Sequence, residues 1–320
     1  MARQAVLLLA HGTPDTVEQI PEYLRNVVSG RPLPQAVVEE IQHRYALIGH
    51  SPLTEITFEQ ARLVERELTS SGATVRVYVG MRNWRPYIPE VVRQMRADGV
   101  EEAAVLCMAP QNSRTSVGLY RRAVEAEAGG LRIDFTEGWA HDPLLAEAFA
   151  ERLRPALHKL NAEVGAPVPV LFTAHSVPCR TIQTPAASEG QPRLWPGAGA
   201  DPYVEEAKST AAMVASLVPE IPRWWFAFQS QGASGGPWIG PAVENTLDSL
   251  AAEGVKTLIL QPIGFLCDHV EILYDVDILF RGYAANAGIR LERPESLNAS
   301  PTLARAVAGL ARQGLERLKG

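Results

Sequence analysis

The chain has 320 residues, of which 46% are hydrophobic and 21% are charged, and its formal net charge is -6. These values exclude a disordered chain, a collagen-like repeat and a coiled coil, and the length indicates about two domains. The acidic balance argues against general binding of nucleic acid or of anionic membrane surfaces, so an anionic ligand needs a local cluster of basic side chains.

The elements expected along the chain alternate between strands and helices. Short apolar runs predict strands at 5–10, 74–79, 102–108, 132–136, 168–173, 224–229, 257–262 and 290–293. Longer amphipathic stretches predict helices, among them 58–70, 88–97, 116–128 and 301–318. This alternation is typical of an α/β protein whose parallel sheets are covered by helices on both faces.

Similar segments recur in the same order in the two halves of the chain. The pairs are 9–14 with 173–178, 86–88 with 237–239, 99–106 with 254–260, and 119–120 with 273–274. A duplicated α/β domain explains this order. We therefore predict an N-terminal domain over 1–150 and a C-terminal domain over 151–320, and the last helix, 301–319, is a candidate to pack back on the first domain.

The cysteines and the apolar runs indicate a compartment. Cys107, Cys179 and Cys267 are an odd number and form no CxxC pair, so they provide neither a disulfide framework nor a four-thiolate cluster. No apolar run approaches the roughly 20 residues that span a bilayer, and the first residues do not resemble a signal peptide. We expect a cytoplasmic protein with no integral membrane association.

Two irregular stretches follow the first strand of each half. Residues 21–34 suggest a short helix and a loop, and residues 181–202, rich in Pro, Gly, Ala and Ser, suggest a long surface excursion. Both are expected at the carboxyl ends of parallel strands, where α/β proteins bind their ligands.

His175 and the segment 264–275 carry the strongest chemical signal. His175 ends a buried strand, where an imidazole suits proton transfer or metal ligation, although a histidine that ties down the loop by hydrogen bonds is an equal alternative. In a helix, Glu271 and Asp275 share a face with His269 near its amino end, and such a set suits Fe(II), Co(II), Mn(II) or Zn(II). The alternative is a capping arrangement in which Asp268 is the N-cap and Glu271 the third helical residue.

The first half offers a different set of side chains. Guanidinium and hydroxyl groups on otherwise apolar loops suit a ligand with several carboxylates, although each residue alone reads as an ordinary loop residue. The candidates are His11, Arg31, Arg44, Tyr45, Ser51 and Tyr120. Neither a GxGxxG motif after the first strand nor a GxxxxGK[ST] motif is present, so nothing indicates a dinucleotide or ATP site.

Four segments together resemble the ferrochelatase family, whose members insert Fe(II) into a porphyrin. They are Ala-His-Gly-Thr-Pro at 10–14, Arg-Tyr-Ala-Leu-Ile-Gly-His-Ser-Pro-Leu at 44–53, Phe-Thr-Ala-His-Ser-Val-Pro at 172–178, and Gln-Pro-Ile-Gly-Phe-Leu-Cys-Asp-His-Val-Glu-Ile-Leu-Tyr-Asp at 261–275. The resemblance runs from about residue 6 to 318. It implies two similar Rossmann-like domains, each a parallel sheet flanked by helices, with the porphyrin in a cleft between them.

The resemblance also implies roles for single residues. His175 and Glu271 match the family's catalytic and metal-handling positions, Asp275 a further metal position, and Asp268 and His269 supporting positions of the same motif. A further acid that continues this helix face in some relatives is replaced here by a leucine at position 279. The porphyrin-binding positions match His11, Arg31, Arg44, Tyr45, Ser51 and Tyr120, and His11 stands where several relatives have tyrosine.

The expected activity is that of a lyase in haem biosynthesis. The resemblance to soluble bacterial relatives implies insertion of Fe(II) into coproporphyrin III to give coproheme. We expect a monomer, and the three scattered cysteines predict that it has no iron–sulfur cluster. The alternatives are protoporphyrin IX as the porphyrin, a sirohydrochlorin chelatase, a non-enzymatic tetrapyrrole carrier and a bilobal small-molecule binding protein.

Overall fold

The structure is a computed structural model that describes residues 3–70, 75–114, 116–182, 201–231 and 236–319. The chain divides into two compact units, one formed by 1–139 with 298–320 and the other by 140–297. Most of the predicted excursion at 181–202 lies outside the described residues. No helix in the described part is both long and apolar enough to cross a membrane.

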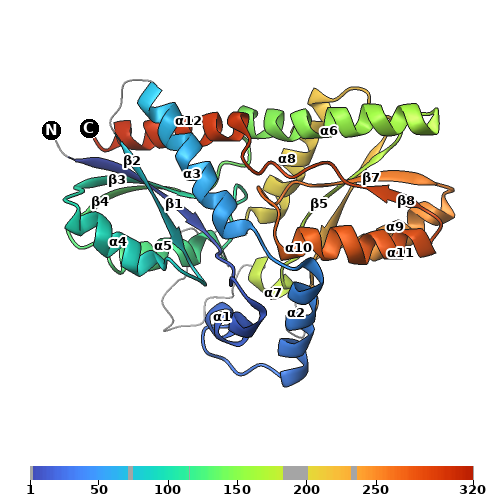
Figure 1. Cartoon of the computed structure of the whole chain (residues 1–320). Helices are drawn as coiled ribbons and strands as arrows, with labels where there is room; N and C mark the ends of the chain where they lie inside the picture. The colour runs from blue at the N-terminus through green and yellow to red at the C-terminus, as the bar shows by residue number, and fades with distance from the viewer. Residues whose placement is uncertain (1–2, 71–74, 115, 183–200, 232–235, 320) are drawn as a thin grey trace. The chain divides into compact units, whose positions relative to one another are not determined.

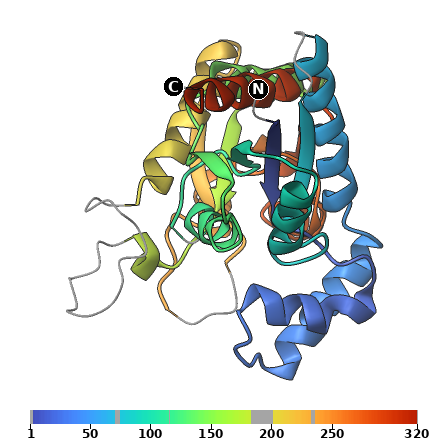
Figure 2. The same ribbon diagram turned by 90° about the vertical axis from the view of Figure 1, so that its left-hand side faces the viewer.

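The first unit contains a parallel sheet of four strands in the order β2-β1-β3-β4 (Figure 1). The strands are β1 (Gln4–Ala10), β2 (Arg76–Met81), β3 (Glu102–Cys107) and β4 (Arg132–Thr136). The helices are α1 (Ile20–Val27), α2 (Gln35–Ile48), α3 (Leu53–Ser70), α4 (Ile88–Ala97), α5 (Val117–Glu125) and α12 (Pro301–Arg317), and a 3-10 turn precedes α1 at Val17–Gln19. Figures 1 and 2 show α1 and α2 beyond the carboxyl end of β1.

Both faces of β1 are buried because helices cover both sides of the sheet. Leu7 and Leu9 pack with Val92 and Met95 of α4 in one core cluster. On the other side, α12 contacts β3 and β4, and α3 contacts β2. Continuous burial of this kind explains why the strand reads as an unbroken apolar run in the sequence.

The second unit repeats this topology with a sheet in the order β6-β5-β7-β8. The strands are β5 (Val170–His175), β6 (Trp224–Gln229), β7 (Thr257–Pro262) and β8 (Arg290–Glu292). The helices are α6 (Pro143–Val164), α7 (Cys179–Ile182), α8 (Tyr203–Leu217), α9 (Val243–Ala252), α10 (Val270–Leu273) and α11 (Arg281–Asn286), with a π-helical turn at Asp275–Phe280 between α10 and α11. The prediction of two similar α/β domains with parallel sheets flanked by helices is confirmed.

The strands begin close to where the apolar runs predict them, with one informative shift. The run at 168–173 forms a strand at 170–175 instead, because Pro169 has no N–H to donate to the ladder. The ladder starts at Val170, whose N–H donates to Arg223 O at 3.1 Å, and the shift makes His175 the last residue of β5.

The structure also corrects one pairing of the repeat. The equivalent of Pro86 is Pro241 rather than Pro237, since the N–H groups of Met81 and Phe228 donate to Pro86 O and Pro241 O respectively. Both prolines follow a cis peptide bond.

The last helix of each sequence half packs in the unit of the other half. The predicted boundary between residues 150 and 151 lies inside α6, which packs on α8 and β7 of the second unit. In turn, α12 packs on the first unit, where Arg317 donates to both carboxylate oxygens of Asp134 at 2.8 and 2.7 Å. Gly314 permits this approach, because a Cβ there would lie 3.0 Å from Ala104 Cβ.

Candidate functional site

The second unit brings His175 and the segment after β7 together. His175 is the last residue of β5 and pairs in register with Gln229, the last residue of β6. The chain leaving β7 passes close to β5 at Gly264, where a Cβ would lie 3.2 Å from Ala174 Cα. Glycine at 264 therefore lets the segment that carries Glu271 approach β5 closely.

The centre of the site is an ion pair between an imidazole and a carboxylate. His175 Nε2 lies 3.3 Å from Glu271 Oε1, and His269 Nε2 lies 3.6 Å from Glu271 Oε2. The side chains of His175 and Glu271 are 32% and 33% exposed, whereas that of His269 is 10% exposed. The pair is therefore open to a ligand on one side and supported by His269 on the other.

The two groups shift each other's protonation in opposite directions. Burial alone would lower the pKa of His175, but the charge and the hydrogen bond of Glu271 outweigh burial, so the pKa lies above its ordinary value. Burial alone would raise the pKa of Glu271, but His175 and His269 hold it well below its usual range. Near neutral pH this arrangement favours a proton on His175 and a charge on Glu271.

The remaining contacts of His175 fix the ring. Its Nδ1 hydrogen-bonds to Ser176 O, so both ring nitrogens face acceptors, as an imidazolium requires. The Tyr203 hydroxyl donates to the backbone oxygen of His175 at 2.8 Å. Ser176 is fully buried and its hydroxyl donates to Ile239 O, which leaves it no role as a nucleophile activated by His175.

Asp275 lies in the π-helical turn and is held from β6. The Ser230 hydroxyl donates to Asp275 Oδ2, and the Gln229 amide donates to both Ser230 Oγ and Glu271 O at 3.3 Å. Asp275 is 3% exposed, and its charge also contributes to raising the pKa of His175. This network ties Asp275 to the helix backbone beside Glu271.

Asp268 has a different role from the capping one considered above. The N-cap of α10 is His269, and Asp268 accepts a hydrogen bond from Ser296 at 2.7 Å and pairs with Arg293 at 3.3 Å. Arg293 also bonds both carboxylate oxygens of Asp277, at 2.8 and 2.7 Å. The interpretation of Asp268 as a helix cap is therefore wrong. Through its ion pairs with Asp268 and Asp277, Arg293 connects the loop before Glu271 to the π-helical turn after it.

The metal-ligating set predicted from the sequence is brought together only in part. Within the described residues, no three His, Cys, Asp or Glu side chains lie so that they could hold one metal ion between them. His175 and Glu271 form a close pair, while the carboxylate of Asp275 is bound to Ser230.

In the first unit, His11 lies in a cluster just beyond the carboxyl end of β1. Its Nε2 is 2.9 Å from the Tyr23 hydroxyl oxygen and 3.0 Å from Asn83 Nδ2. Asn83 follows β2 and is 1% exposed, and its backbone oxygen accepts from Asn26 Nδ2 at 3.1 Å. His11 is thus anchored by α1 and by the loop after β2.

The three hydroxyl residues predicted to bind the porphyrin are buried in this unit. Tyr45 hydrogen-bonds to Thr13 at 2.9 Å. Ser51 is 1% exposed, and its hydroxyl has no hydrogen-bond partner among the described residues. Tyr120 is 4% exposed, and burial raises the pKa of its phenol far above its ordinary value.

The two predicted arginines lie nearer the surface. Arg31 is exposed, and its Nε donates to Val28 O at 3.0 Å. Arg44 is paired with Glu40 of the same helix at 2.9 Å. A partly exposed pair one helical turn apart is worth only about 0.3–0.5 kcal/mol, so a ligand carboxylate could replace Glu40 at little cost.

Sequence reasoning missed the supporting residues Tyr23 and Asn83 around His11, and the tie from Ser230 to Asp275. A signal for two of them exists, because Asn83 is the second residue after β2 and Ser230 the first after β6, as the histidines follow or end β1 and β5. Polar residues at the carboxyl ends of all strands of a parallel sheet, edge strands included, are candidates in an α/β protein.

Replacing the acid of the pair should reverse the pKa shift of the histidine. In Glu271→Gln, burial persists while the attraction is gone, so we expect the pKa of His175 to fall from above about 6.5 to below it. NMR titration of the histidine ring protons, assigned with His175→Gln, measures the change. Glu220→Gln, which removes the partner of the exposed His158, is the control and should leave His175 unchanged. An identical His175 pKa in Glu271→Gln and the wild type would contradict the electrostatic account.

Comparison with known proteins identifies the family. The ferrochelatase family model matches residues 3–315. A ferrochelatase of Acidobacterium capsulatum is 61% identical over 99% of this chain and 96% of its own, and a coproporphyrin III ferrochelatase of Mycolicibacterium vanbaalenii is 35% identical over 97% and 89%. The sirohydrochlorin chelatase SirB of Bacillus subtilis subspecies spizizenii shares the fold, with a TM-score of 0.57 at 10% identity over 99% of this chain and 97% of that one. Because the family model spans nearly the whole chain and these relatives are similar over almost their full lengths, the chain belongs to the ferrochelatase family.

Proposed function

We propose that this ferrochelatase, a porphyrin metal chelatase and therefore a lyase, inserts Fe(II) into coproporphyrin III to give coproheme in haem biosynthesis. The main support for the proposal is the ion pair between His175 Nε2 and Glu271 Oε1, which lie 3.3 Å apart. Iron and the porphyrin are both substrates, and insertion releases the two protons of the pyrrole N–H groups. The chain must therefore supply proton acceptors and a carboxylate that can bind a dication.

We assign His175 and Glu271 to these two tasks. Once His175 has lost its own proton, its Nε2 can accept one from a pyrrole nitrogen. Glu271, held ionised by its histidine neighbours, can bind the incoming Fe(II), with Asp275 as a further oxygen ligand after release from Ser230. His269 and Arg293 hold the Glu271 segment in place.

We propose that residues of the first unit bind the porphyrin. They are His11, Tyr45, Ser51 and Tyr120, together with Arg31 and Arg44, which bind its carboxylates. Support comes from the unsatisfied hydroxyl of Ser51, because a buried polar group without a partner is costly unless a ligand satisfies it. Arginine suits a planar carboxylate through two parallel hydrogen bonds. A non-enzymatic tetrapyrrole carrier needs neither a histidine with a raised pKa nor its ion pair with Glu271, so these features favour the enzyme.

The cysteines bear on the compartment of the enzyme and on whether it holds an iron–sulfur cluster. We propose a cytoplasmic enzyme, which suits three free cysteines, two of them buried thiols. We also propose that it works without an iron–sulfur cluster, because a cluster held by four thiolates needs one cysteine more than the sequence contains.

The choice of porphyrin is tested by turnover with two substrates side by side. We expect kcat/KM to be at least about tenfold higher for coproporphyrin III than for protoporphyrin IX. Coproporphyrin III has two additional carboxylates, and their contacts with arginine and hydroxyl groups should contribute about 1.5 kcal/mol or more. The assay follows anaerobic Fe(II) insertion by absorbance at matched porphyrin concentrations. A clear preference for protoporphyrin IX would overturn the choice of coproporphyrin and leave the ferrochelatase activity standing.

Removing the imidazole tests the role of His175. In His175→Ala we expect Fe(II) insertion to fall about 100-fold or more, the usual contribution of a general base, while the Kd for the metal-free porphyrin changes little. The matched control is His158→Ala, an exposed histidine of the same unit that pairs with Glu220. Near-normal turnover of His175→Ala would exclude His175 as the base.

A further inference from the structure

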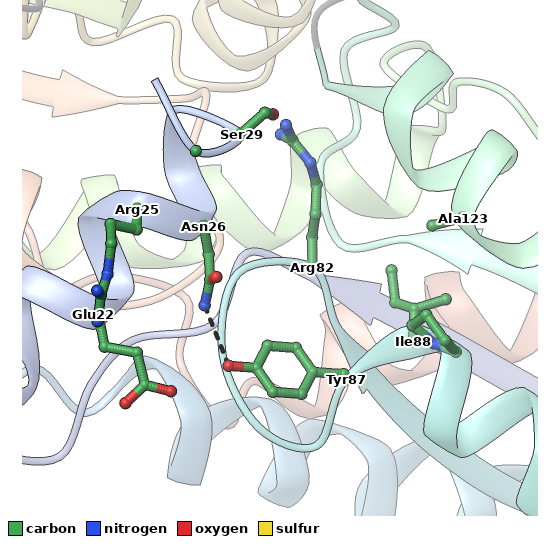
Figure 3. A pocket seen from close by; sticks show the side chains of 10 residues that line it. Glu22, Arg25, Asn26, Ser29, Arg82, Tyr87, Ile88 and Ala123 are labelled. Carbon is green, nitrogen blue, oxygen red and sulfur yellow. Dashed lines mark hydrogen bonds between the residues drawn. The ribbon is translucent and has the colours of Figure 1, made fainter. Parts of the chain in front are cut away.

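A cavity of about 610 Å³ lies in the first unit between α1, the loop after β2 and α5 (Figure 3). None of the residues assigned to the porphyrin above lines it. Its walls are formed by Glu22, Arg25, Asn26, Ser29, Gly30, Arg82, Tyr87, Ile88, Pro89 and Ala123.

The most unusual wall residue is Arg82. Its side chain is half-buried, and its guanidinium group forms no hydrogen bond or ion pair with a described residue. Burial lowers the pKa of Arg82, the neighbouring Tyr120 opposes this shift, and Arg122 adds to it. A half-buried cation beside a second cation destabilises the empty protein and is stabilised by a bound anion.

The other charges at the cavity do not neutralise Arg82. Glu22, the acid in the wall, pairs with Arg85 at 3.4 Å, and Arg85 does not line the cavity. Arg25 is exposed on the last turn of α1 and forms no ion pair with a described residue. The cavity therefore carries an excess of positive charge although the whole protein is acidic.

The backbone at the end of α1 adds a second feature. Ser29 has a φ of 54°, a left-handed conformation that is uncommon for a residue other than glycine, and it directly precedes Gly30. Figure 3 shows the Ser29 hydroxyl and the Arg82 guanidinium group on the same side of the cavity. This left-handed conformation ends α1, where the Gly30 N–H donates to Arg25 O at 2.7 Å, and it leaves the exposed Ser29 available to a ligand of Arg82.

The chemistry of the walls distinguishes between anions. Ile88, Pro89 and Ala123 make part of the wall apolar, and Tyr87 is fixed by a hydrogen bond between its hydroxyl and Asn26 Nδ2 at 3.0 Å (Figure 3). A bare phosphate would gain nothing from such a wall, whereas a carboxylate on a short alkyl arm satisfies both parts.

We propose that this cavity binds an alkyl carboxylate through Arg82, with Arg25 and Ser29 in support. The inference rests on the proposed function, since the carboxylate is then a propionate arm of the porphyrin. Arg82 is close in sequence to the residues around His11. It directly precedes Asn83, which forms hydrogen bonds with both His11 and Asn26. Arg82 is thereby a substrate-binding residue in addition to Arg31 and Arg44.

The test measures the affinity of variants for metal-free coproporphyrin III by fluorescence titration. We expect Arg82→Gln to raise the Kd about tenfold or more and Arg82→Lys to raise it less, because one charge-assisted contact is lost or weakened. Arg25→Gln, at an exposed position that cannot unfold the protein, should raise the Kd about twofold to fivefold. The matched control Arg93→Gln removes one positive charge at the pair with Glu127 on α4, away from the cavity, and should leave the Kd within about twofold.

Two further readouts separate binding from a structural role and from other anions. A structural arginine would lower the melting temperature when removed, whereas Arg82→Gln without ligand should melt at the same temperature or higher, because an unpaired half-buried charge is gone. Inorganic phosphate should not compete with the porphyrin for the wild type. An unchanged Kd in both Arg82→Gln and Arg25→Gln, or competition by phosphate that Arg82→Gln abolishes, would overturn the inference. Wild-type turnover would in either case still support the ferrochelatase activity.

Discussion

The contact between His175 and Glu271 is the interaction on which the rest of the site depends. It requires β5 to end at residue 175, a glycine at 264 that lets the next segment approach, and a histidine at 269 behind the acid. The result is a proton held on an imidazole and a charge held on a carboxylate in a partly buried place. In our proposal, His175 loses this proton and then accepts one from a pyrrole nitrogen, and the charged Glu271 binds the incoming dication.

The repeated topology gives each unit a histidine at the same structural position. His11 follows the central strand β1 and His175 ends the central strand β5, in sheets of the same strand order. Their surroundings differ, since His11 contacts a tyrosine and an asparagine, whereas His175 contacts an acid. In this ferrochelatase the two positions have diverged chemically, and our proposal assigns the porphyrin to the first and the metal chemistry to the second.

The sequence predicted those features that depend on local pattern. Apolar runs predicted the strands, and their ends predicted His175 and the Glu271 segment, because parallel strands bring polar residues to one edge of a sheet. Features that depend on distant partners were not predictable. Asp268 looked like a cap, but its partner Arg293 follows β8. The sequence named the last helix, α12, as a candidate to pack on the first unit, whereas it gave no sign that α6 belongs to the second. The sequence did not single out Arg82, because only the three-dimensional structure shows that a half-buried arginine has no ion-pair partner among the described residues.

The most direct measurement of the central claim is the number of protons released when a divalent metal binds. Calorimetry with Zn(II) as a redox-inert probe, at pH 6.5 in two buffers of different ionisation enthalpy, gives this number. Since the pKa of His175 is raised, the account predicts release of more than about half a proton per metal bound, and a loss of that release in His175→Gln. Metal binding without proton release, or with the same release in His175→Gln, would contradict it.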